Sequence, residues 1–229
     1  MKTNFIDSFY FQNYNIFKTS RPILDGYLIY RFLKWNSNIQ NYLEIGIFKG
    51  GCFSIIAETN NKIKCFLIDP DMNDFKNTIP KNLTKNTTCF EQKSIDVNWN
   101  SLPNFDLIIW DGDPNPPTPL DDIVKCVSKS NNNTVLCLSW INYPDMDIVK
   151  NFLKKEGWTQ WIKLDSCQLW SKKSLQPFID HLIYEKNGLF NFSKIHKGNN
   201  DDDYKWLISS PMCVYDNVQI VEKYIRNED

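Results

Sequence analysis

The chain has 229 residues, of which 42% are hydrophobic, and a net charge of −1. This length suits one folded domain with an appendage and leaves room for a well-buried core. A nearly neutral chain has no overall field that attracts nucleic acid or an anionic membrane, so we expect neither as a partner.

Residue usage predicts a reducing, cytoplasmic location. The seven cysteines are odd in number and contain no Cys-x-x-Cys pair, which argues against a disulfide framework. Residues 1–15 lack the apolar core of a signal peptide, and no run approaches transmembrane length. The 23 lysines, three arginines and single alanine indicate AT-rich codons, as in a low-GC bacterium, a protist or a large DNA virus.

The first predicted element is an amphipathic helix that follows an N-terminal arm of residues 1–21. Pro22 favours a helix start, and apolar side chains recur after it at helical spacing, namely Leu24, Leu28, Phe32 and Trp35. This helix leads into a short apolar strand over about 41–46.

A glycine-rich turn after this strand is the most informative segment of the chain. Glycines stand at positions 46, 50 and 51, and a helix is predicted over about 50–60. Open α/β sheets bind small polar ligands at such turns, because glycine lets the backbone approach closely and the first helical N–H groups point at the ligand. Glu44 stands where the dinucleotide-binding pattern has its first glycine. A tight turn without any ligand is the alternative interpretation.

Carboxylates follow two of the next strands. We predict strands over about 63–69, 88–92 and 105–110. The first of them ends in Asp69, where an acid can accept hydrogen bonds from ribose hydroxyls. The third is followed by Asp111 and Asp113, with Gly112 between them.

The remaining elements complete an alternating pattern. Thr118-Pro119 opens a predicted helix, and a nearly all-apolar strand follows it, as expected when helices cover both faces of a parallel sheet. The apolar face of the helix comprises Leu120, Ile123, Val124 and Val127; the strand covers 134–140, a helix covers 147–156 before Gly157, and β runs over 158–164 and 167–170 flank a turn at Asp165-Ser166.

Together these segments resemble the class I S-adenosylmethionine-dependent methyltransferases. The run from Leu43 to Gly51 is similar to motif I of that family, most closely in its macrocin O-methyltransferase and cephalosporin-hydroxylase-like branch, and the run from Phe105 to Asp113 resembles the strand-4 motif. The resemblance covers residues 22–173. It implies an α/β, Rossmann-like sheet of seven mostly parallel strands in the order 3-2-1-4-5-7-6, with strand 7 antiparallel and helices on both faces.

Residues 174–229 form a C-terminal extension outside the resemblance. Its predicted parts are a helix-like stretch over 175–186, a polar loop that ends at 201–203, and a helix-like stretch over 218–226. Such an extension suits a cap over a substrate cleft or a contact in a homodimer.

The resemblance implies S-adenosylmethionine as the cofactor. Glu44 and the glycine-loop amides would hold its methionine end, and Asp69 would hold its ribose. Ser94 and Ile95 correspond to the loop that contacts adenine, although Ser94 also suits a simple turn. The implied cofactor-binding residues are Glu44, Gly46, Phe48, Gly50, Gly51, Asp69, Ser94, Ile95 and Asp111.

Asp113 and Asp111 are the predicted catalytic residues, because they lie where the methyl group would be delivered. A carboxylate there can act as a general base, bind a divalent cation or cap a turn. In the resembled branch a histidine often follows Asp-Gly-Asp, and strand 5 often ends in two aspartates that complete a Mg²⁺ site. Here Pro114 and the run 139–142 stand instead. We therefore predict no metal site, while Asp111 with Asn142 leaves magnesium open as an alternative.

Other side chains are weaker candidates. His181 and His196 lie in the extension, where each suits a base that reaches into the cleft or an ordinary surface or packing residue. Four aromatic side chains suit an acceptor pocket or the core, namely Trp140, Tyr143, Trp158 and Trp161.

The leading functional hypothesis is O-methylation of a sugar or another small hydroxyl-bearing metabolite. The alternative is a protein of the same fold that binds a ligand or partner without catalysis, since the histidine and the paired aspartates are missing. A nicotinamide enzyme is disfavoured by Glu44. Nucleic-acid methylation is disfavoured because the chain lacks a basic groove and an Asn/Asp-Pro-Pro-Tyr motif.

Overall fold

The computed structural model describes residues 23–140, 142–144, 146–164, 167–184, 191–194 and 206–209. The helices are α3 (Ile23–Trp35), α4 (Gly51–Thr59), α5 (Asn73–Thr78), α6 (Thr118–Ser128), α7 (Met146–Lys155) and α8 (Gln176–Tyr184), with short 3-10 turns η1 (Lys81–Thr84), η2 (Ser94–Asp96) and η3 (Trp99–Ser101). The strands are β1 (Asn41–Ile45), β2 (Lys64–Ile68), β3 (Thr87–Phe90), β4 (Phe105–Trp110), β5 (Ser130–Leu138), β6 (Thr159–Lys163), β7 (Gln168–Ser171), β8 (Asn191–Lys194) and β9 (Trp206–Ser209).

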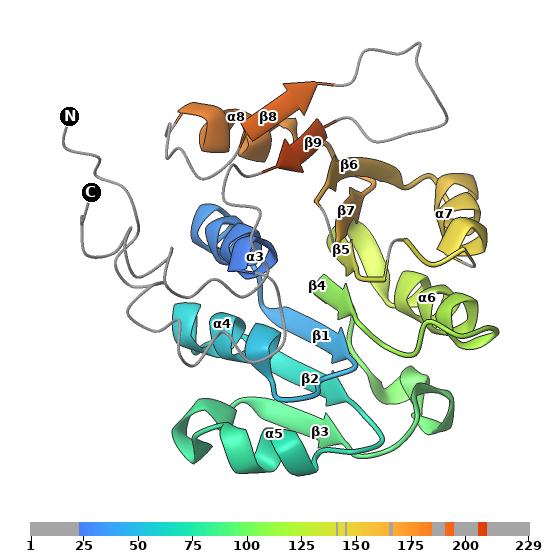
Figure 1. Ribbon diagram of the computed structural model, residues 1–229. Coiled ribbons are helices and arrows are strands. Elements are labelled where there is room, and N and C mark those ends of the chain that lie inside the picture. The colour runs from blue at the N-terminus through green and yellow to red at the C-terminus, as the bar shows by residue number, and fades with distance from the viewer. Residues whose placement is uncertain are drawn as a thin grey trace.

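All the strands belong to one sheet in the order β3-β2-β1-β4-β5-β7-β6-β9-β8 (Figure 1). The first five strands of this order pair in parallel, and β7 runs antiparallel to both of its neighbours. The predicted order 3-2-1-4-5-7-6 is therefore confirmed. After β1 the chain continues to β2 and β3 toward one edge of the sheet, and after β4 it continues to β5 toward the other edge. The strand order therefore reverses between the neighbouring strands β1 and β4.

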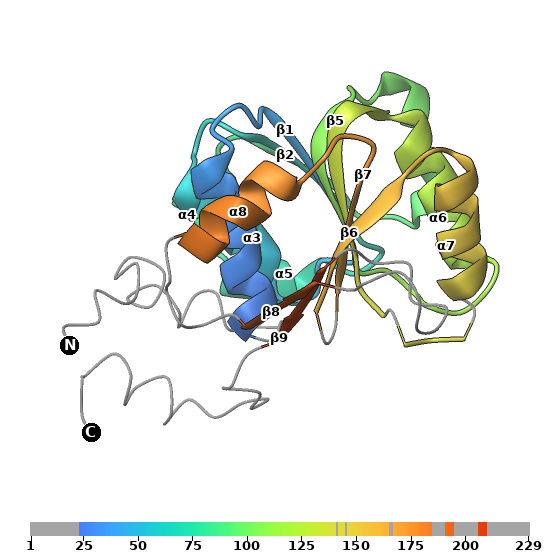
Figure 2. The same cartoon turned by 90° about the horizontal axis from the view of Figure 1, so that it is seen from above.

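Helices cover both faces of the sheet, as Figure 2 shows, with α3, α4 and α8 on one side and α6 and α7 on the other. Alternate residues of β5 enter the two separate cores: Val135 and Cys137 pack on the first side, and Leu136 and Leu138 on the second. This explains the nearly all-apolar sequence of the strand, because both of its faces are buried.

The buried face of α6 differs from the predicted one. The predicted residue Ile123 is buried, and Leu120 and Val127 are partly buried against the same core, but Val124 is 44% exposed. The fully buried residues of the helix are Pro119, Asp122, Ile123 and Cys126. The face is thus rotated to include an aspartate, which a search for apolar spacing passes over.

The C-terminal extension adds two strands that the sequence did not predict. β9 pairs in parallel with β6, and β8 pairs antiparallel with β9, so the extension continues the sheet at this edge. The predicted helix at its start is confirmed as α8. The polar loop over 201–203 and the helix-like stretch over 218–226 lie outside the described residues, and the cap or homodimer role of the extension stays a prediction.

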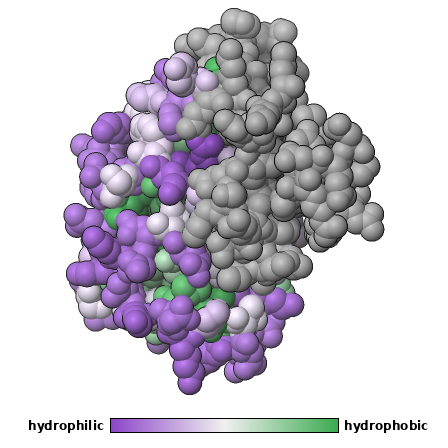
Figure 3. All heavy atoms as spheres, turned by 90° about the vertical axis from the view of Figure 1, so that its left-hand side faces the viewer, coloured by the Kyte–Doolittle hydropathy of each residue, from purple (hydrophilic) through white to green (hydrophobic). Residues whose placement is uncertain are grey.

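The described part of the face in Figure 3 is mostly hydrophilic, with small and separate hydrophobic areas. Among the described residues, no helix is long and apolar enough to cross a membrane.

Candidate functional site

A cavity of about 490 Å³ lies at the carboxyl ends of β1, β2 and β4. Its walls are completed by η2 and by the first turn of α6. The predicted residues that line it are Gly46, Asp69, Ser94, Ile95, Asp111 and Asp113. Four other predicted cofactor residues do not line it, namely Glu44, Phe48, Gly50 and Gly51.

Gly46 is the glycine on which the shape of this edge depends. Its φ is +81°, and a Cβ at this position would lie 2.2 Å from the carbonyl oxygen of Asp111. Only glycine therefore lets the loop after β1 pass so close to the loop after β4. Gly50 has a different role: a Cβ there would meet the side chains of Phe75 and Ile79 at 2.7 and 2.9 Å, so this glycine lets α4 pack against α5.

Asp69 holds the glycine loop from the end of the neighbouring strand. Its Oδ2 accepts hydrogen bonds from the backbone N–H groups of Ile47, at 2.7 Å, and Phe48, at 3.3 Å. Its Oδ1 accepts one from the N–H of Asp71 at 2.9 Å. These bonds fix the loop although Phe48 has a positive φ of 49°, a conformation that costs energy for a residue with a Cβ.

Glu44 lies inside the sheet and not at its edge. It is 2% exposed, and its Oε2 accepts a hydrogen bond of 2.6 Å from the Tyr42 hydroxyl on the same face of β1. The proximity of Glu44 and the burial of the ring raise the pKa of Tyr42, burial being the larger cause. A direct contact between Glu44 and a cofactor stays a prediction.

Ser94 is held by a residue that the sequence analysis missed. Its hydroxyl donates a short hydrogen bond to Oδ1 of Asp122, and the Trp110 indole N–H donates to Oδ2 at 3.0 Å. Burial raises the pKa of Asp122, while the bonds from Ser94 and Trp110 and the charge of Lys125 act in the opposite direction. The signal in the sequence was a carboxylate at a core-facing position of α6.

The two predicted catalytic aspartates differ in their surroundings. Asp111 is half-buried, and its backbone N–H donates to the carbonyl of Ile45 at 2.8 Å, which ties the two loops together. Asp113 is exposed, and its Oδ1 accepts hydrogen bonds from the backbone and the side chain of Asn115, at 3.0 and 2.6 Å. Both line the cavity, and Asp113 is the more accessible of the two.

Two exposed aromatic rings follow β5 at the same end of the sheet. Trp140 and Tyr143 are each 43% exposed and make an edge-to-face pair with ring centroids 5.6 Å apart. Trp140 has a φ of +57°, which is an outlier for a bulky residue. By contrast, Trp158 and Trp161 are buried in the two cores.

The remaining candidates lie away from the cavity walls. Asn142 does not line the cavity. His181 is on α8, where partial burial and Arg31 lower its pKa, and His196 lies outside the described residues. Within the described part of the chain, no group of three His, Cys, Asp or Glu side chains is placed to hold a metal ion.

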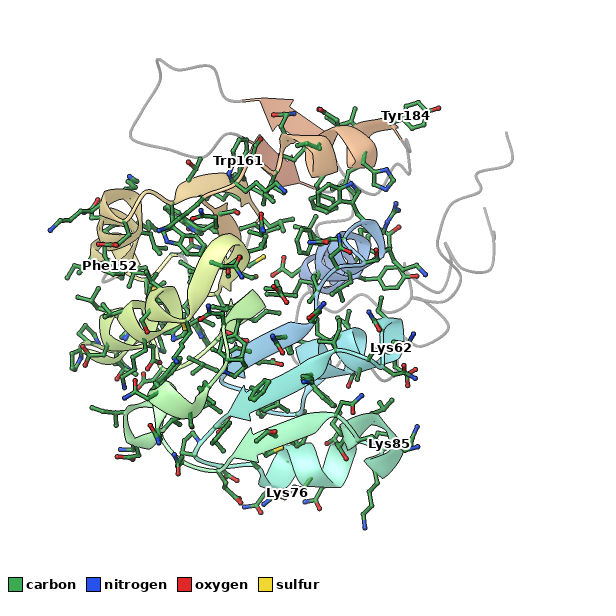
Figure 4. All side chains as sticks on the ribbon, turned by 180° about the vertical axis from the view of Figure 1, so that it is seen from behind. Lys62, Lys76, Lys85, Phe152, Trp161 and Tyr184 are labelled. Atoms are coloured by element: carbon green, nitrogen blue, oxygen red, sulfur yellow. The ribbon has the colours of Figure 1, made fainter. Side chains whose placement is uncertain are left out.

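Positive side chains are sparse at this site. Lys93 is the lysine in the cavity wall, which also contains five aspartates. Figure 4 places Lys62 and Lys85 where β2 and β3 begin, at the opposite end of these strands. Lys76 on α5 forms an ion pair with Glu91 at 2.6 Å. Lys62 and Lys85 therefore lie away from the cavity.

Comparison with family models and with curated protein sequences finds no match. Solved structures do match. The chain is similar to a "putative caffeoyl-CoA O-methyltransferase" from Staphylococcus aureus (TM-score 0.55, 13% identity, 73% of this chain and 93% of that chain). It is also similar to an rRNA methylase from Streptococcus thermophilus (0.53, 11%, 68% and 99%) and to human methyltransferase-like protein 13 in complex with S-adenosylhomocysteine, SAH (0.53, 13%, 71% and 87%).

The chain has the class I methyltransferase fold. The strand order and the similar structures agree on this point. Identities of 11–13% carry the fold and not the acceptor, and the names of the similar structures cover both O-methylation and rRNA methylation. The acceptor must therefore be inferred from the residues that line the cavity.

Proposed function

We propose that this protein is an S-adenosylmethionine-dependent methyltransferase that acts on a small hydroxyl-bearing acceptor, such as a sugar. The observation that carries the proposal is the convergence of Gly46, Asp69 and Ser94 on one cavity where the strand order reverses between β1 and β4. Open α/β sheets bind their ligands at this point. The cavity volume of about 490 Å³ lies within the range usual for ligand pockets.

The residues present fit an adenosyl cofactor. Asp69 accepts three backbone hydrogen bonds, and an ionised carboxylate has about four acceptor sites. Capacity therefore remains for a ribose hydroxyl. Gly46 leaves the cavity wall without a side chain, and Ser94 and Ile95 line the part where adenine would lie.

Charge supports a cationic cofactor and an acceptor without phosphates. Five aspartates and one lysine line the cavity, and a cleft lined by one sign of charge concentrates ligands of the opposite sign. S-adenosylmethionine supplies, when bound, a methyl group on a positively charged sulfur. A nucleic-acid acceptor would bring a phosphate backbone, which requires neutralising Lys and Arg side chains. The composition of the cavity therefore favours a small neutral acceptor over RNA.

Asp113 is the group we assign to the acceptor proton. It is exposed, lines the cavity and follows β4, so its carboxylate can receive the proton that a hydroxyl loses as its oxygen is methylated. Trp140 and Tyr143 offer exposed aromatic faces at the same edge, and sugars and planar rings pack on such faces.

One observation favours the non-catalytic alternative. Asp113 accepts two hydrogen bonds from Asn115 on a single oxygen, so part of the carboxylate that would receive the acceptor's proton is already occupied. A protein of this fold with such an aspartate can bind the cofactor without transferring its methyl group.

Transfer of labelled methyl groups from S-adenosylmethionine to panels of sugars, phenols and amines tests the proposal. We expect label in a hydroxyl-bearing acceptor, with activity that survives EDTA. Loss of activity in EDTA with recovery on added Mg²⁺ would place a metal in the reaction and contradict that part of the proposal. Tight SAH binding with no labelled acceptor in any panel would favour the non-catalytic alternative.

A further inference from the structure

We propose that Asp122 fixes the hydrogen-bond polarity of Ser94, so that the cavity selects a purine with an exocyclic amino group over one with a carbonyl at the same position. Asp122 acts here as a positioning residue, through the serine hydroxyl. The inference rests on the proposed function, because it concerns the adenine end of the cofactor.

Asp122 joins three elements at the base of the cavity. It belongs to the first turns of α6, is 2% exposed, and bonds to Ser94 of η2 and to Trp110 of β4. The Trp110 indole N–H can only donate a hydrogen bond, so Oδ2 of Asp122 must be the acceptor. The other carboxylate oxygen faces the Ser94 hydroxyl.

The direction of the Ser94 bond follows from proton counting. An ionised carboxylate has no proton to donate, and a serine hydroxyl has one. The hydroxyl must therefore donate its hydrogen bond to Asp122. Only its lone pairs remain for any other partner, so toward a ligand it can only accept. The charged and titratable groups that act on Asp122 are Lys125 and Asp121 of the same helix, and Lys125 favours the ionised form.

Ser94 is also fixed by its backbone. Its carbonyl oxygen accepts hydrogen bonds from the Trp99 indole N–H at 2.8 Å and from the Lys125 ammonium at 3.3 Å. With both ends of the residue held, the hydroxyl oxygen is a fixed acceptor in a residue that lines the cavity.

A fixed acceptor is complementary to an N–H donor. The exocyclic amine of adenine is a donor, whereas the 6-oxo group of hypoxanthine is an acceptor. Two acceptors that face each other in a partly buried site leave both without a proton, which is costly. We therefore expect the protein to bind SAH roughly 10- to 100-fold more tightly than S-inosylhomocysteine.

Calorimetric titration of these two ligands against four proteins tests the inference. The proteins are wild type, Ser94→Ala, Asp122→Asn and, as the control for loss of one charge, Asp74→Asn, which changes an exposed aspartate of α5 outside the cavity wall. Ser94→Ala should bind SAH and reduce the preference to within about threefold, because the acceptor is gone. In Asp122→Asn the new amide can donate a hydrogen bond to the Ser94 oxygen, and the serine O–H can then donate to the ligand. The preference for SAH over S-inosylhomocysteine should therefore fall further or invert. The control should keep the wild-type preference.

The outcomes separate the two proposals. Wild-type protein that binds SAH and S-inosylhomocysteine equally would overturn the polarity inference and leave the cofactor assignment intact. A wild-type preference that persists in Ser94→Ala would also overturn it. Wild-type protein that binds neither ligand would overturn both. Thermal unfolding of each variant shows whether Asp122→Asn is folded, and Ser94→Ala carries the test if it is not.

Discussion

The two halves of the cavity edge are held in different ways. On the side that we assign to the cofactor, contacts link residues far apart in the chain: the N–H groups of Ile47 and Phe48 donate to Asp69, and the Ser94 hydroxyl donates to Asp122. On the side that we assign to the acceptor, Asp113 accepts hydrogen bonds from Asn115, two residues away, and Trp140 and Tyr143, which do not line the cavity, are each 43% exposed.

The difference indicates which half is built in advance. Long-range hydrogen bonds between strand ends preorganise a site before a ligand arrives, and preorganisation lowers the cost of binding. Local bonds and exposed rings leave the acceptor side open. We therefore expect mutations on the two sides to separate binding from turnover.

The largest expected effect is on the acceptor side. Asp113→Asn should lower turnover by about 10²- to 10⁴-fold, the usual contribution of a general base, and leave SAH affinity nearly unchanged. Steady-state kinetics and calorimetry measure the two quantities. Asp74→Asn on α5, an exposed position outside the cavity, is the control for loss of one charge. Full activity in Asp113→Asn would show that another group takes the proton.

The next effect is on the glycine loop. Gly46→Ala should lower the free energy of unfolding by about 2–5 kcal/mol, through the positive φ and the clash with the Asp111 carbonyl. Gly157→Ala is the matched control, since Gly157 has a φ of +82° and nothing within 4 Å of its Cβ position. It should cost only about 1–2 kcal/mol. Equal costs in urea unfolding would contradict the close approach of the two loops.

A smaller effect is expected for the ribose contact. Asp69→Asn should weaken SAH binding by roughly 1–3 kcal/mol, because a charge-assisted acceptor is lost and the loop is held less firmly. Asp71→Asn is the control, since Asp71 lies two residues further on and bonds to the N–H of Asn73. SAH affinity that is equal in the two variants would remove Asp69 from the cofactor site.

The smallest effect is a pH dependence of stability that originates at Asp122. Its pKa is raised above 3.8 in the folded protein, with burial as the main cause. Between 3.8 and the raised pKa the folded state therefore binds more protons than the unfolded state, so Asp122 makes stability fall as pH rises through this window. Unfolding of Asp122→Asn should lack this component. An identical pH profile for wild type and variant would contradict the raised pKa.

Much of the fold was predictable from the sequence, because the strands of a parallel sheet buried on both faces stand out as apolar runs. The order of the first seven strands followed from their resemblance to a known pattern. The strands β8 and β9 were missed, because each has four residues and their pairing with β6 depends on contacts distant in sequence.

Site residues were predictable at positions where the local structure requires one particular residue type. Gly46 and Asp69 are such cases, since the close loop approach requires glycine and the strand end exposes the carboxylate. Asp122 was not predictable, because the buried face of a helix is recognised in a sequence by its apolar residues, and Asp122 is a polar residue on that face. Glu44 was assigned to the cofactor by resemblance, and the structure places it in the core, where it accepts a hydrogen bond from Tyr42. The sequence alone does not indicate this pairing.

Calorimetric titration of the purified protein with SAH and, separately, with NAD⁺ tests the central claim most directly. We predict a saturable heat with SAH at micromolar affinity, a matching rise in the unfolding temperature, and neither signal with NAD⁺. Heat and a thermal shift with NAD⁺ but not with SAH would contradict the assignment of this cavity to an adenosyl methyl donor.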